Sequence, residues 1–231
     1  MPTQLGFRFG VGPAGILGGA APDWRQTVAR IERLGYSTLC VGDHLSMMGP
    51  LPALAAAAAW TERIGLGSAV AGNDYRSPLL LAQDAATVQA LSGGRLELGI
   101  GAGWDRADYR QLGLEFESPG RRIERLGEAV TIVKRYLAGE AFSFHGDHYQ
   151  LDEVLPLPVP LPRQPRIMIG GGGPRILSLA AREADVVGIN VPLRGADVRQ
   201  SIAAGDTAGD RVAAAVETIR AAAGERFAEL E

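Results

Sequence analysis

Short apolar runs of the kind that form buried strands alternate along the chain with longer segments whose apolar residues recur at helical spacing. The strand-like runs lie at Leu5–Gly10, Thr38–Gly42, Ile64–Val70, Arg95–Gly101, Arg166–Gly170 and Val186–Asn190. The segments between them begin with capping residues such as Asp23, Ser77 and Ser118, and several end at glycine. They predict helices over Trp24–Leu34, Pro52–Arg63, Ser77–Leu91, Ser118–Ala138, Pro174–Glu183 and Gly209–Ala223.

This alternation indicates an α/β fold in which helices cover a parallel sheet. We expect a barrel of the TIM (β/α)8 type rather than an open doubly wound sheet. The reasons are that Leu5–Phe9 places Arg8 among apolar residues and that glycines recur at strand ends. The chain is predicted to form a single domain over residues 1–231. Because the pattern supplies strands for six β/α units only, the last two units of the barrel are expected to be missing.

One segment, at about residues 140–165, interrupts the alternation. Phe142–Gln164 begins with a strand-like run, turns at Gly146 and Asp147, and continues into a proline-rich stretch that ends at Pro165. We predict a β-hairpin that makes an excursion over the mouth of the barrel.

A tract of four glycines follows the fifth strand-like run, and a proline-started helix follows the tract. Gly170, Gly171, Gly172 and Gly173 offer backbone N–H groups without side chains, and Pro174 suits a first helical position. The start of a helix is a favourable place for an anion. The tract therefore predicts a phosphate site, with Arg175 as a possible aid.

Two well-known glycine-loop chemistries do not fit this tract. A dinucleotide fingerprint would need glycine at Arg175 and an acidic residue at Asn190. A nucleotide triphosphatase loop would need a lysine after the glycines, and the one lysine of the chain is Lys134, inside a predicted helix. The ligand that still fits the glycine tract is a phosphorylated coenzyme or sugar.

The catalytic side chains of a β/α barrel lie at the carboxyl ends of its strands. The second strand ends in Asp43 and His44, so His44 is a candidate acid or hydrogen-bond donor, with Asp43 fixing its tautomer. Trp104 follows the fourth strand and is expected either to line a cofactor or substrate site or to plug the barrel. The other candidates at strand ends and in the following loops are Ser68, Ala69, Asn73, Arg76, Gly101 and Gly103.

Charge and composition argue against several classes of partner. The net charge of −3 and the scattered arginines make nucleic acid and anionic membranes unlikely partners. No apolar run is long enough for a membrane span, and no leader pattern is present, so we expect a cytoplasmic protein. Cys40 is a lone thiol in an apolar strand, and no metal is expected because His145 and His148 have no Cys or Glu at ligand spacing.

Four motifs in order resemble the bacterial luciferase-like monooxygenase superfamily, and within it the oxidoreductases that use the deazaflavin coenzyme F420. They are Val41–His44, the stretch from Ser68 to Pro78, Leu91–Trp104 with its two glycine clusters, and Ile169–Gly173. The resemblance covers the chain from Leu5 to about Leu230, and the fold of that superfamily is a TIM barrel.

The resemblance implies roles for particular residues. His44 would be the catalytic candidate, with Asp43 beside it near the reactive face of the coenzyme ring. Ser68 and Ala69 would form a non-proline cis peptide bulge against that ring, and the glycine tract would grip the coenzyme phosphate. Trp104 stands where the sugar-phosphate dehydrogenases of this group have an acidic glutamate, so their proton-transfer scheme is not expected here.

The resulting hypothesis is an oxidoreductase that transfers a hydride between coenzyme F420 and a small-molecule substrate. Within the same superfamily, the alternative is a monooxygenase that uses FMN and molecular oxygen. Two hypotheses from other classes are a non-catalytic, truncated coenzyme-binding remnant and a flavin-free enzyme that binds a sugar phosphate. The apolar helix Leu51–Trp60 makes a homodimer possible, although this helix could equally pack on the barrel.

Overall fold

The computed structural model describes residues 7–12, 23–156, 163–190 and 208–231. A parallel sheet with the strand order β1-β2-β3-β5-β8-β9 forms its centre, and the short strand β4 pairs beside β5. The strands are β1 (Gly10–Val11), β2 (Thr38–Val41), β3 (Gly65–Ser68), β4 (Ala71–Gly72), β5 (Leu96–Gly101), β8 (Arg166–Gly171) and β9 (Val186–Ile189). The expected α/β architecture with a parallel sheet is confirmed.

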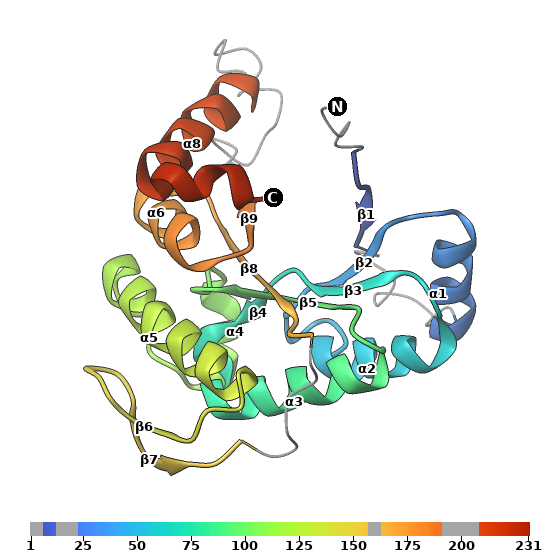
Figure 1. Cartoon of the computed structure of the whole chain (residues 1–231), viewed down its shortest axis with the longest axis horizontal. Helices are drawn as coiled ribbons and strands as arrows, with labels where there is room; N and C mark the ends of the chain where they lie inside the picture. The colour runs from blue at the N-terminus through green and yellow to red at the C-terminus, as the bar shows by residue number, and fades with distance from the viewer. Residues whose placement is uncertain (1–6, 13–22, 157–162, 191–207) are drawn as a thin grey trace.

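Helices alternate with these strands and cover the outer side of the sheet (Figure 1). They are α1 (Trp24–Arg33), α2 (Pro50–Trp60), α3 (Pro78–Leu91), α4 (Arg106–Leu112), α5 (Pro119–Leu137), α6 (Pro174–Glu183) and α8 (Ala208–Ala223), with 3-10 turns η1 (Asn73–Tyr75) and η2 (Gly224–Glu229). The described part of the chain contains no helix that combines the length and the apolar character needed to cross a membrane.

The capping residues predicted from the sequence begin the helices as expected. Asp23 accepts hydrogen bonds from the backbone N–H groups of Arg25 and Gln26, and Ser77 and Ser118 cap α3 and α5 in the same way. Helix α2, by contrast, ends three residues before the predicted Arg63. The reason is that Glu32 accepts three backbone N–H groups, from Glu62 to Ile64, which holds that stretch outside the helix.

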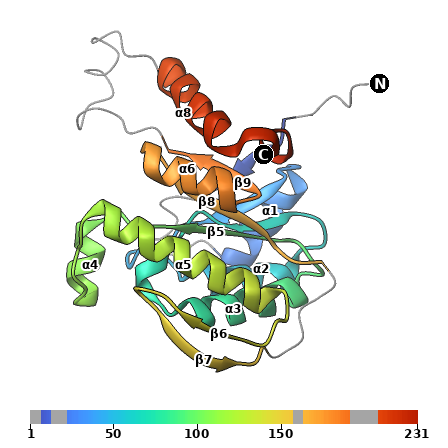
Figure 2. The same cartoon turned by 60° about the vertical axis from the view of Figure 1, so that its left-hand side comes forward.

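Ion pairs join the two edges of the sheet, which shows that it is rolled rather than flat. Arg8, beside β1, lies 2.9 Å from a carboxylate oxygen of Glu231, and Glu231 lies beside β9. Glu97 of β5 and Arg166 of β8 complete this cluster, with an Arg8–Glu97 distance of 3.2 Å. The sheet therefore has the curvature of a barrel wall, as Figure 2 also shows.

The sheet continues by one step beyond β9. The backbone N–H of Glu231 donates to the carbonyl of Asp185 at 3.2 Å, and the N–H of Val187 donates to the carbonyl of Glu231 at 2.8 Å. This pair of bonds is the pattern of a parallel ladder. The outer edge of β9 is thus partly covered by the residues that follow η2.

The main core lies between the sheet and the helices α2, α3 and α5. Leu39, Leu66, Leu98 and Ile169 of the strands are fully buried there. The apolar side of α2 belongs to the same core, with Leu51, Leu54 and Ala57 all buried, so this helix is packed on the barrel wall. A smaller cluster joins α6 to α8 through Leu177, Ala181, Ala215 and Ile219.

The first predicted strand differs from the structure. Of the run Leu5–Gly10, the described residues Phe7 and Phe9 are 93% and 69% exposed, and regular pairing begins only at Gly10. Phe7 and Phe9 therefore do not face the core. The alternation Phe-Arg-Phe gives a strand pattern, but the neighbouring strand β2 begins only at Thr38, and the carbonyl of Phe9 accepts the backbone N–H and the hydroxyl of Ser37, both at 2.9 Å.

The predicted hairpin exists, but it does not cross the mouth of the barrel. Strands β6 (Phe142–His145) and β7 (Gln150–Val154) pack beside α5 (Figure 2). Glu128 of α5 accepts the backbone N–H groups of Asp147, His148 and Tyr149 and so fixes the turn. The proline-rich part of this excursion falls partly at residues 157–162, outside the described residues.

Candidate active site

A pocket of about 570 Å³ opens at the carboxyl ends of the strands. Its wall combines the residue pair after β2, the bulge after β3, the end of β5 with its loop, the glycine tract after β8 and the end of β9. The lining residues are Asp43, His44, Ala69, Val70, Gly72, Tyr75, Gly101, Ala102, Gly103, Trp104, Pro119, Arg122, Ile123, Met168, Gly170, Gly171, Gly172, Gly173, Ile176, Gly188, Ile189 and Asn190. A pocket of this volume is typical of sites for small molecules and coenzymes.

The glycine tract forms one side of this pocket, between β8 and α6. A Cβ atom on Gly171 would lie 2.3 Å from Cγ2 of Ile176, so a side chain there would displace the first turn of α6. Gly173 is the N-cap and supplies no capping side chain, and the first turn of α6 contains no acidic residue. The backbone N–H groups of that turn therefore remain available to an anion in the pocket.

Arg175 lies in a different place from the one expected. It does not line the pocket; it lines a separate groove between α5 and α6, together with Gly120, Leu179 and Arg182. A Cβ atom on Gly120 would come within 2.7 Å of its Nη1 atom. Arg175 thus projects toward α5 rather than into the pocket.

His44 and Asp108 form a close pair at the other side of the pocket. Nδ1 of His44 lies 2.7 Å from Oδ2 of Asp108, and the side chain of Asp108 is only 6% exposed. A carboxylate accepts and cannot donate, so a neutral His44 carries its proton on Nδ1, which leaves Nε2 as an acceptor. The imidazole and the indole of Trp104 meet edge to face, with ring centroids 5.4 Å apart.

Asp43 does not orient His44, contrary to the prediction. Its carboxylate accepts hydrogen bonds from Nη2 of Arg76, at 2.8 and 3.0 Å, and from the backbone N–H of Gly72 at 2.9 Å. Asp43 and His44 are consecutive, and their side chains turn toward different elements. The pair Asp43–Arg76 instead ties the end of β2 to the loop after β4.

Asp108 belongs to α4, a helix that the sequence pattern did not reveal. Its other oxygen, Oδ1, accepts the backbone N–H of Leu45 at 3.3 Å, and the hydroxyl of Tyr75 also hydrogen-bonds to this carboxylate. Burial, reinforced by the charges of Asp108 and Asp43, raises the pKa of Tyr75 to about 12. The phenol is therefore neutral at ordinary pH and can donate to Asp108.

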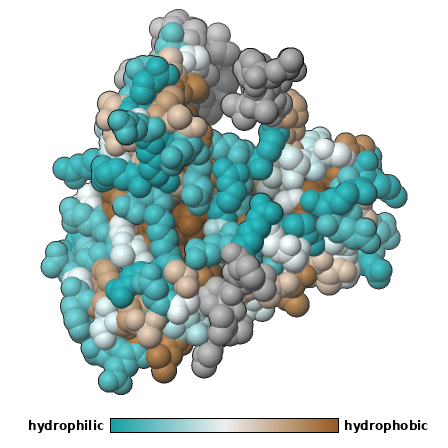
Figure 3. Space-filling view, viewed as in Figure 1, coloured by the Kyte–Doolittle hydropathy of each residue, from teal (hydrophilic) through white to brown (hydrophobic). Residues whose placement is uncertain are grey.

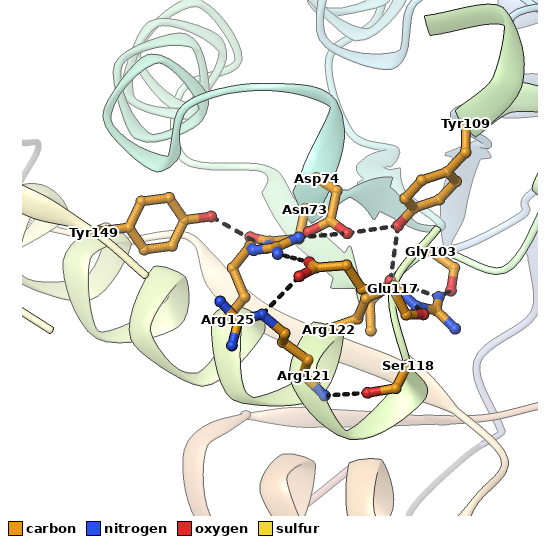
Figure 4. Close-up of polar contacts among 11 residues, drawn as sticks. Asn73, Asp74, Gly103, Tyr109, Glu117, Ser118, Arg121, Arg122, Arg125 and Tyr149 are labelled. Carbon is orange, nitrogen blue, oxygen red and sulfur yellow. Dashed lines mark hydrogen bonds and ion pairs between the residues drawn. The ribbon is translucent and has the colours of Figure 1, made fainter. Parts of the chain in front are cut away.

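A second polar network holds α4 against the end of β5 (Figure 4). The hydroxyl of Tyr109 donates to Asp74 at 2.7 Å and lies 3.2 Å from the carbonyl of Ala102. Burial and the hydrogen bond to Asp74 raise the pKa of Tyr109 well above its usual value. Arg125 of α5 pairs with both Asp74 and Glu117, so charges from η1 and α5 meet at one point.

Arg122 of α5 hydrogen-bonds to the loop that follows β5. Its guanidinium donates to the carbonyls of Ala102, at 3.1 Å, and Gly103, and its Nε atom donates to the carbonyl of Glu117. Gly103 has a positive φ of 75°, and a Cβ atom there would lie 2.3 Å from the hydroxyl oxygen of Tyr109. Glycine is required at this turn for both reasons.

Of the remaining predicted residues, Ala69, Gly101 and Gly103 line the pocket, whereas Ser68 and Asn73 do not. Ser68 is fully buried, and its hydroxyl exchanges hydrogen bonds with the backbone of Gly99. The non-proline cis peptide is present, but it joins Ala69 to Val70, one bond later than expected. Asn73 is buried beside Asp74 and Tyr149, and its Oδ1 atom has no partner among the described residues.

Trp104 lines the pocket and is 69% exposed, so its indole is not a buried plug of the barrel.

His44, Asp105 and Asp108 bring ligand-type atoms within 4.8 Å of one another. The distance of 2.7 Å between His44 and Asp108 is that of a hydrogen bond, and two ligands of one tetrahedral zinc ion would lie roughly 3.3 Å apart. The contact between His44 and Asp108 is therefore a hydrogen bond that orients the imidazole.

The rolled parallel sheet, with a ligand-sized pocket at its strand ends, defines a β/α-barrel protein. The family model for the luciferase-like monooxygenases matches residues 6–229. The chain belongs to the luciferase-like monooxygenase family, which confirms the resemblance seen in its motifs.

A curated relative is the F420-dependent glucose-6-phosphate dehydrogenase of Microbacterium testaceum. The two chains are 33% identical over 163 residues, which is 67% of this chain and 48% of the relative. The chain thus spans about half the length of this relative.

Two solved structures share the fold. An F420-dependent secondary alcohol dehydrogenase, in complex with an F420–acetone adduct, matches with a TM-score of 0.77 and 19% identity, over 97% of this chain and 67% of that one. The oxygenating constituent of 3,6-diketocamphane monooxygenase of Pseudomonas putida, in complex with FMN, matches with a TM-score of 0.72 and 18% identity, over 95% and 63%.

Proposed function

We propose that this chain is an oxidoreductase that binds coenzyme F420 and transfers a hydride to or from a small organic substrate. The observation that carries the proposal is that the glycine tract at α6 and the oriented imidazole of His44 line one and the same pocket. The F420-dependent relative supports the choice of coenzyme.

The glycine tract would hold the phosphate of the coenzyme. The first turn of α6 presents backbone N–H groups and the positive end of the helix dipole, and Gly173 leaves them uncovered. No lysine lines the described pocket, so backbone groups would provide this grip.

The ring of the coenzyme would lie against Ala69, Val70 and the glycines at the end of β5. A Cβ atom on Gly101 would come within 2.6 Å of Cγ2 of Val70, so the wall is closely packed there. When bound, the deazaflavin supplies the acceptor or donor of the hydride.

His44 would handle the proton that accompanies the hydride. Asp108 fixes the ring so that Nε2 is the atom available to the substrate. Asp108 is thus a positioning residue, and it takes the role that the sequence suggested for Asp43.

The substitution Gly173→Asp tests the phosphate site. Aspartate is a strong N-cap, the backbone of Gly173 (φ −89°, ψ 156°) suits it, and nothing lies within 4 Å of the added Cβ. We expect the variant to unfold at the same or a higher temperature, because the carboxylate caps α6. It should also bind F420 at least tenfold more weakly, because the carboxylate occupies and repels the phosphate site.

Two variants serve as controls. Gly173→Asn caps the helix without the charge and should lose less affinity. Gly127→Ala lies on α5, where the new Cβ makes an ordinary contact of 3.6 Å with Leu179, and should bind like the parent. Binding is measured by quenching of F420 fluorescence. If the parent chain binds no F420, the proposal is wrong, and if G173D binds as well as the parent, the phosphate does not lie at α6.

A second candidate is a monooxygenase that uses FMN, favoured by the structural match to an FMN complex. The same pocket and the same glycine tract would serve. Equilibration with each coenzyme separates the two, because tight FMN binding accompanied by oxygen uptake would support the monooxygenase. A chain that binds neither coenzyme would be a non-catalytic remnant.

A further inference from the structure

Three donors of the described chain converge on the carboxylate of Asp108. Nδ1 of His44 lies 2.7 Å from Oδ2, the backbone N–H of Leu45 donates to Oδ1 at 3.3 Å, and the hydroxyl of Tyr75 also hydrogen-bonds to this group. The side chain of Asp108 is 6% exposed, and a buried carboxylate that keeps its charge needs such donors. His44 and Leu45 follow β2, whereas Tyr75 belongs to η1. The phenol and the imidazole thus reach one acceptor from two different elements.

The ring of Tyr75 is fixed in place by packing on two sides. It lies over Gly72, where a Cβ atom would come within 2.6 Å of its Cδ2 and Cε2 atoms. It also meets the ring of Tyr109 edge to face, with centroids 5.5 Å apart. Tyr109 directly follows Asp108 in α4. These ring contacts place the phenol beside Asp108 independently of the hydrogen bond.

Tyr75 and His44 both belong to the wall of the pocket. Figure 3 shows apolar residues gathered in a hollow near the centre of that face, over β5 and β8, and the ends of these two strands form part of the same wall. A hydrogen bond in partly apolar surroundings is electrostatically stronger than one in water. A change at the phenol should therefore be felt at the imidazole through the carboxylate that they share.

The charges near the phenol decide which role it can play. The carboxylates of Asp43, Asp105 and Asp108 all act on it, and Asp43 is also paired with Arg76. Asp105 lies 4.0 Å from Nδ1 of His44 as well. Burial and these negative charges raise the pKa of the phenol to about 12, so its proton stays on the oxygen at ordinary pH. The phenol is therefore a hydrogen-bond donor to the carboxylate and not a base.

We propose that Tyr75 is a positioning residue that acts on His44 through Asp108. This inference rests on the proposed function, to which the proton transfer at Nε2 belongs. When two donors share one carboxylate, each draws on its negative charge, and each is bound less strongly than it would be alone. The phenol thus limits the attraction between Asp108 and the imidazolium that forms when Nε2 takes up a proton. A limited attraction lets His44 release that proton again.

Tyr75→Phe tests the proposal, because it removes the hydroxyl and keeps the ring over Gly72. The measurement is the proton NMR resonance of Nδ1–H of His44 in the whole, coenzyme-free chain, at low temperature to slow its exchange. We expect this resonance to move downfield, because Asp108 with one donor fewer binds the imidazole more strongly. Placing 3-fluorotyrosine at position 75 should move it upfield, because a more acidic phenol is a stronger donor to the same carboxylate.

Tyr149→Phe is the matched control. It also removes a half-buried hydroxyl, but this hydroxyl contacts Nδ2 of Asn73, at 3.3 Å, instead of Asp108. The resonance of His44 should stay where it is in the parent. A purely structural role of Tyr75 would leave it there in Y75F as well.

The outcomes separate this inference from the proposed function. An unmoved or upfield resonance in Y75F would overturn the inference, and so would a downfield shift with 3-fluorotyrosine. Binding of F420, followed by quenching of its fluorescence, is measured on the same samples of the parent. If F420 does not bind, the proposed function fails, and the NMR comparison still decides whether Tyr75 acts on His44 through Asp108.

Discussion

Asp108→Asn is expected to move the proton of neutral His44 from Nδ1 to Nε2. The backbone N–H of Leu45 donates to Oδ1 of Asp108 at 3.3 Å, so the amide oxygen of the asparagine should occupy that side. The amide NH2 group then faces Nδ1 of His44, at the position where Oδ2 lay 2.7 Å away. Because an amide NH2 can only donate, Nδ1 must become the acceptor and the proton must move to Nε2.

The magnitude follows from the bond that is lost. A hydrogen bond to a charged group contributes about 1.5–3 kcal/mol. If that energy holds His44 in the productive tautomer, kcat should fall roughly 10- to 150-fold. KM for the coenzyme should change little, because the proposed phosphate site at α6 is on another part of the wall.

The assay is 15N NMR of histidine-labelled protein at about pH 9, above the usual titration range of the side chain. The parent should show a protonated Nδ1 at His44 and D108N a protonated Nε2, with His44→Gln used to assign the resonance. Asp105→Asn is the control. Asp105 lies 4.0 Å from the ring and caps α4 through Ala107, and asparagine caps as well as aspartate. An unchanged Nδ1–H signal in D108N would refute the reasoning.

Three further outcomes are expected. Tyr109→Phe removes the bond to the buried Asp74 and should lower the free energy of unfolding in urea by about 1–2 kcal/mol, and equal stability would contradict the role of this network. The phenol of Tyr75, whose pKa burial raises to about 12, deprotonates in the unfolded chain near pH 10. The melting temperature should therefore fall more steeply between pH 10 and 12 in the parent than in Y75F. Arg175→Ala should change F420 affinity less than twofold, and a tenfold loss would place Arg175 at the phosphate after all.

The parts of the site that lie on regular elements were predictable from the sequence. The ends of parallel strands meet at one edge of a sheet, so the residues after β2, β5 and β8 had to lie near one another. His44, Trp104 and the glycine tract do so. The caps Asp23, Ser77 and Ser118 were predictable because their bonds involve residues two or three positions away.

Pairings between distant residues were not predictable in this way. His44 and Asp108 are 64 positions apart, and α4, with only seven residues, is too short to show a clear helical period. A carboxylate next to a histidine in the sequence suggested Asp43 as its partner. Packing decided otherwise, because Arg76 and the N–H of Gly72 are better placed to satisfy Asp43.

The segment after β5 contributes both to the pocket wall and to the orientation of His44. Trp104 directly precedes the N-cap of α4 and Asp108 lies in its first turn, so the indole of the pocket wall and the carboxylate that orients His44 belong to one short segment. This segment is held by Tyr109, which is bound to Asp74, and by Arg122, which is bound to the carbonyls of the loop. A shift of α4 should therefore change the contacts of Trp104 and the orientation of His44 together, whereas the proposed coenzyme binding at α6 should not change.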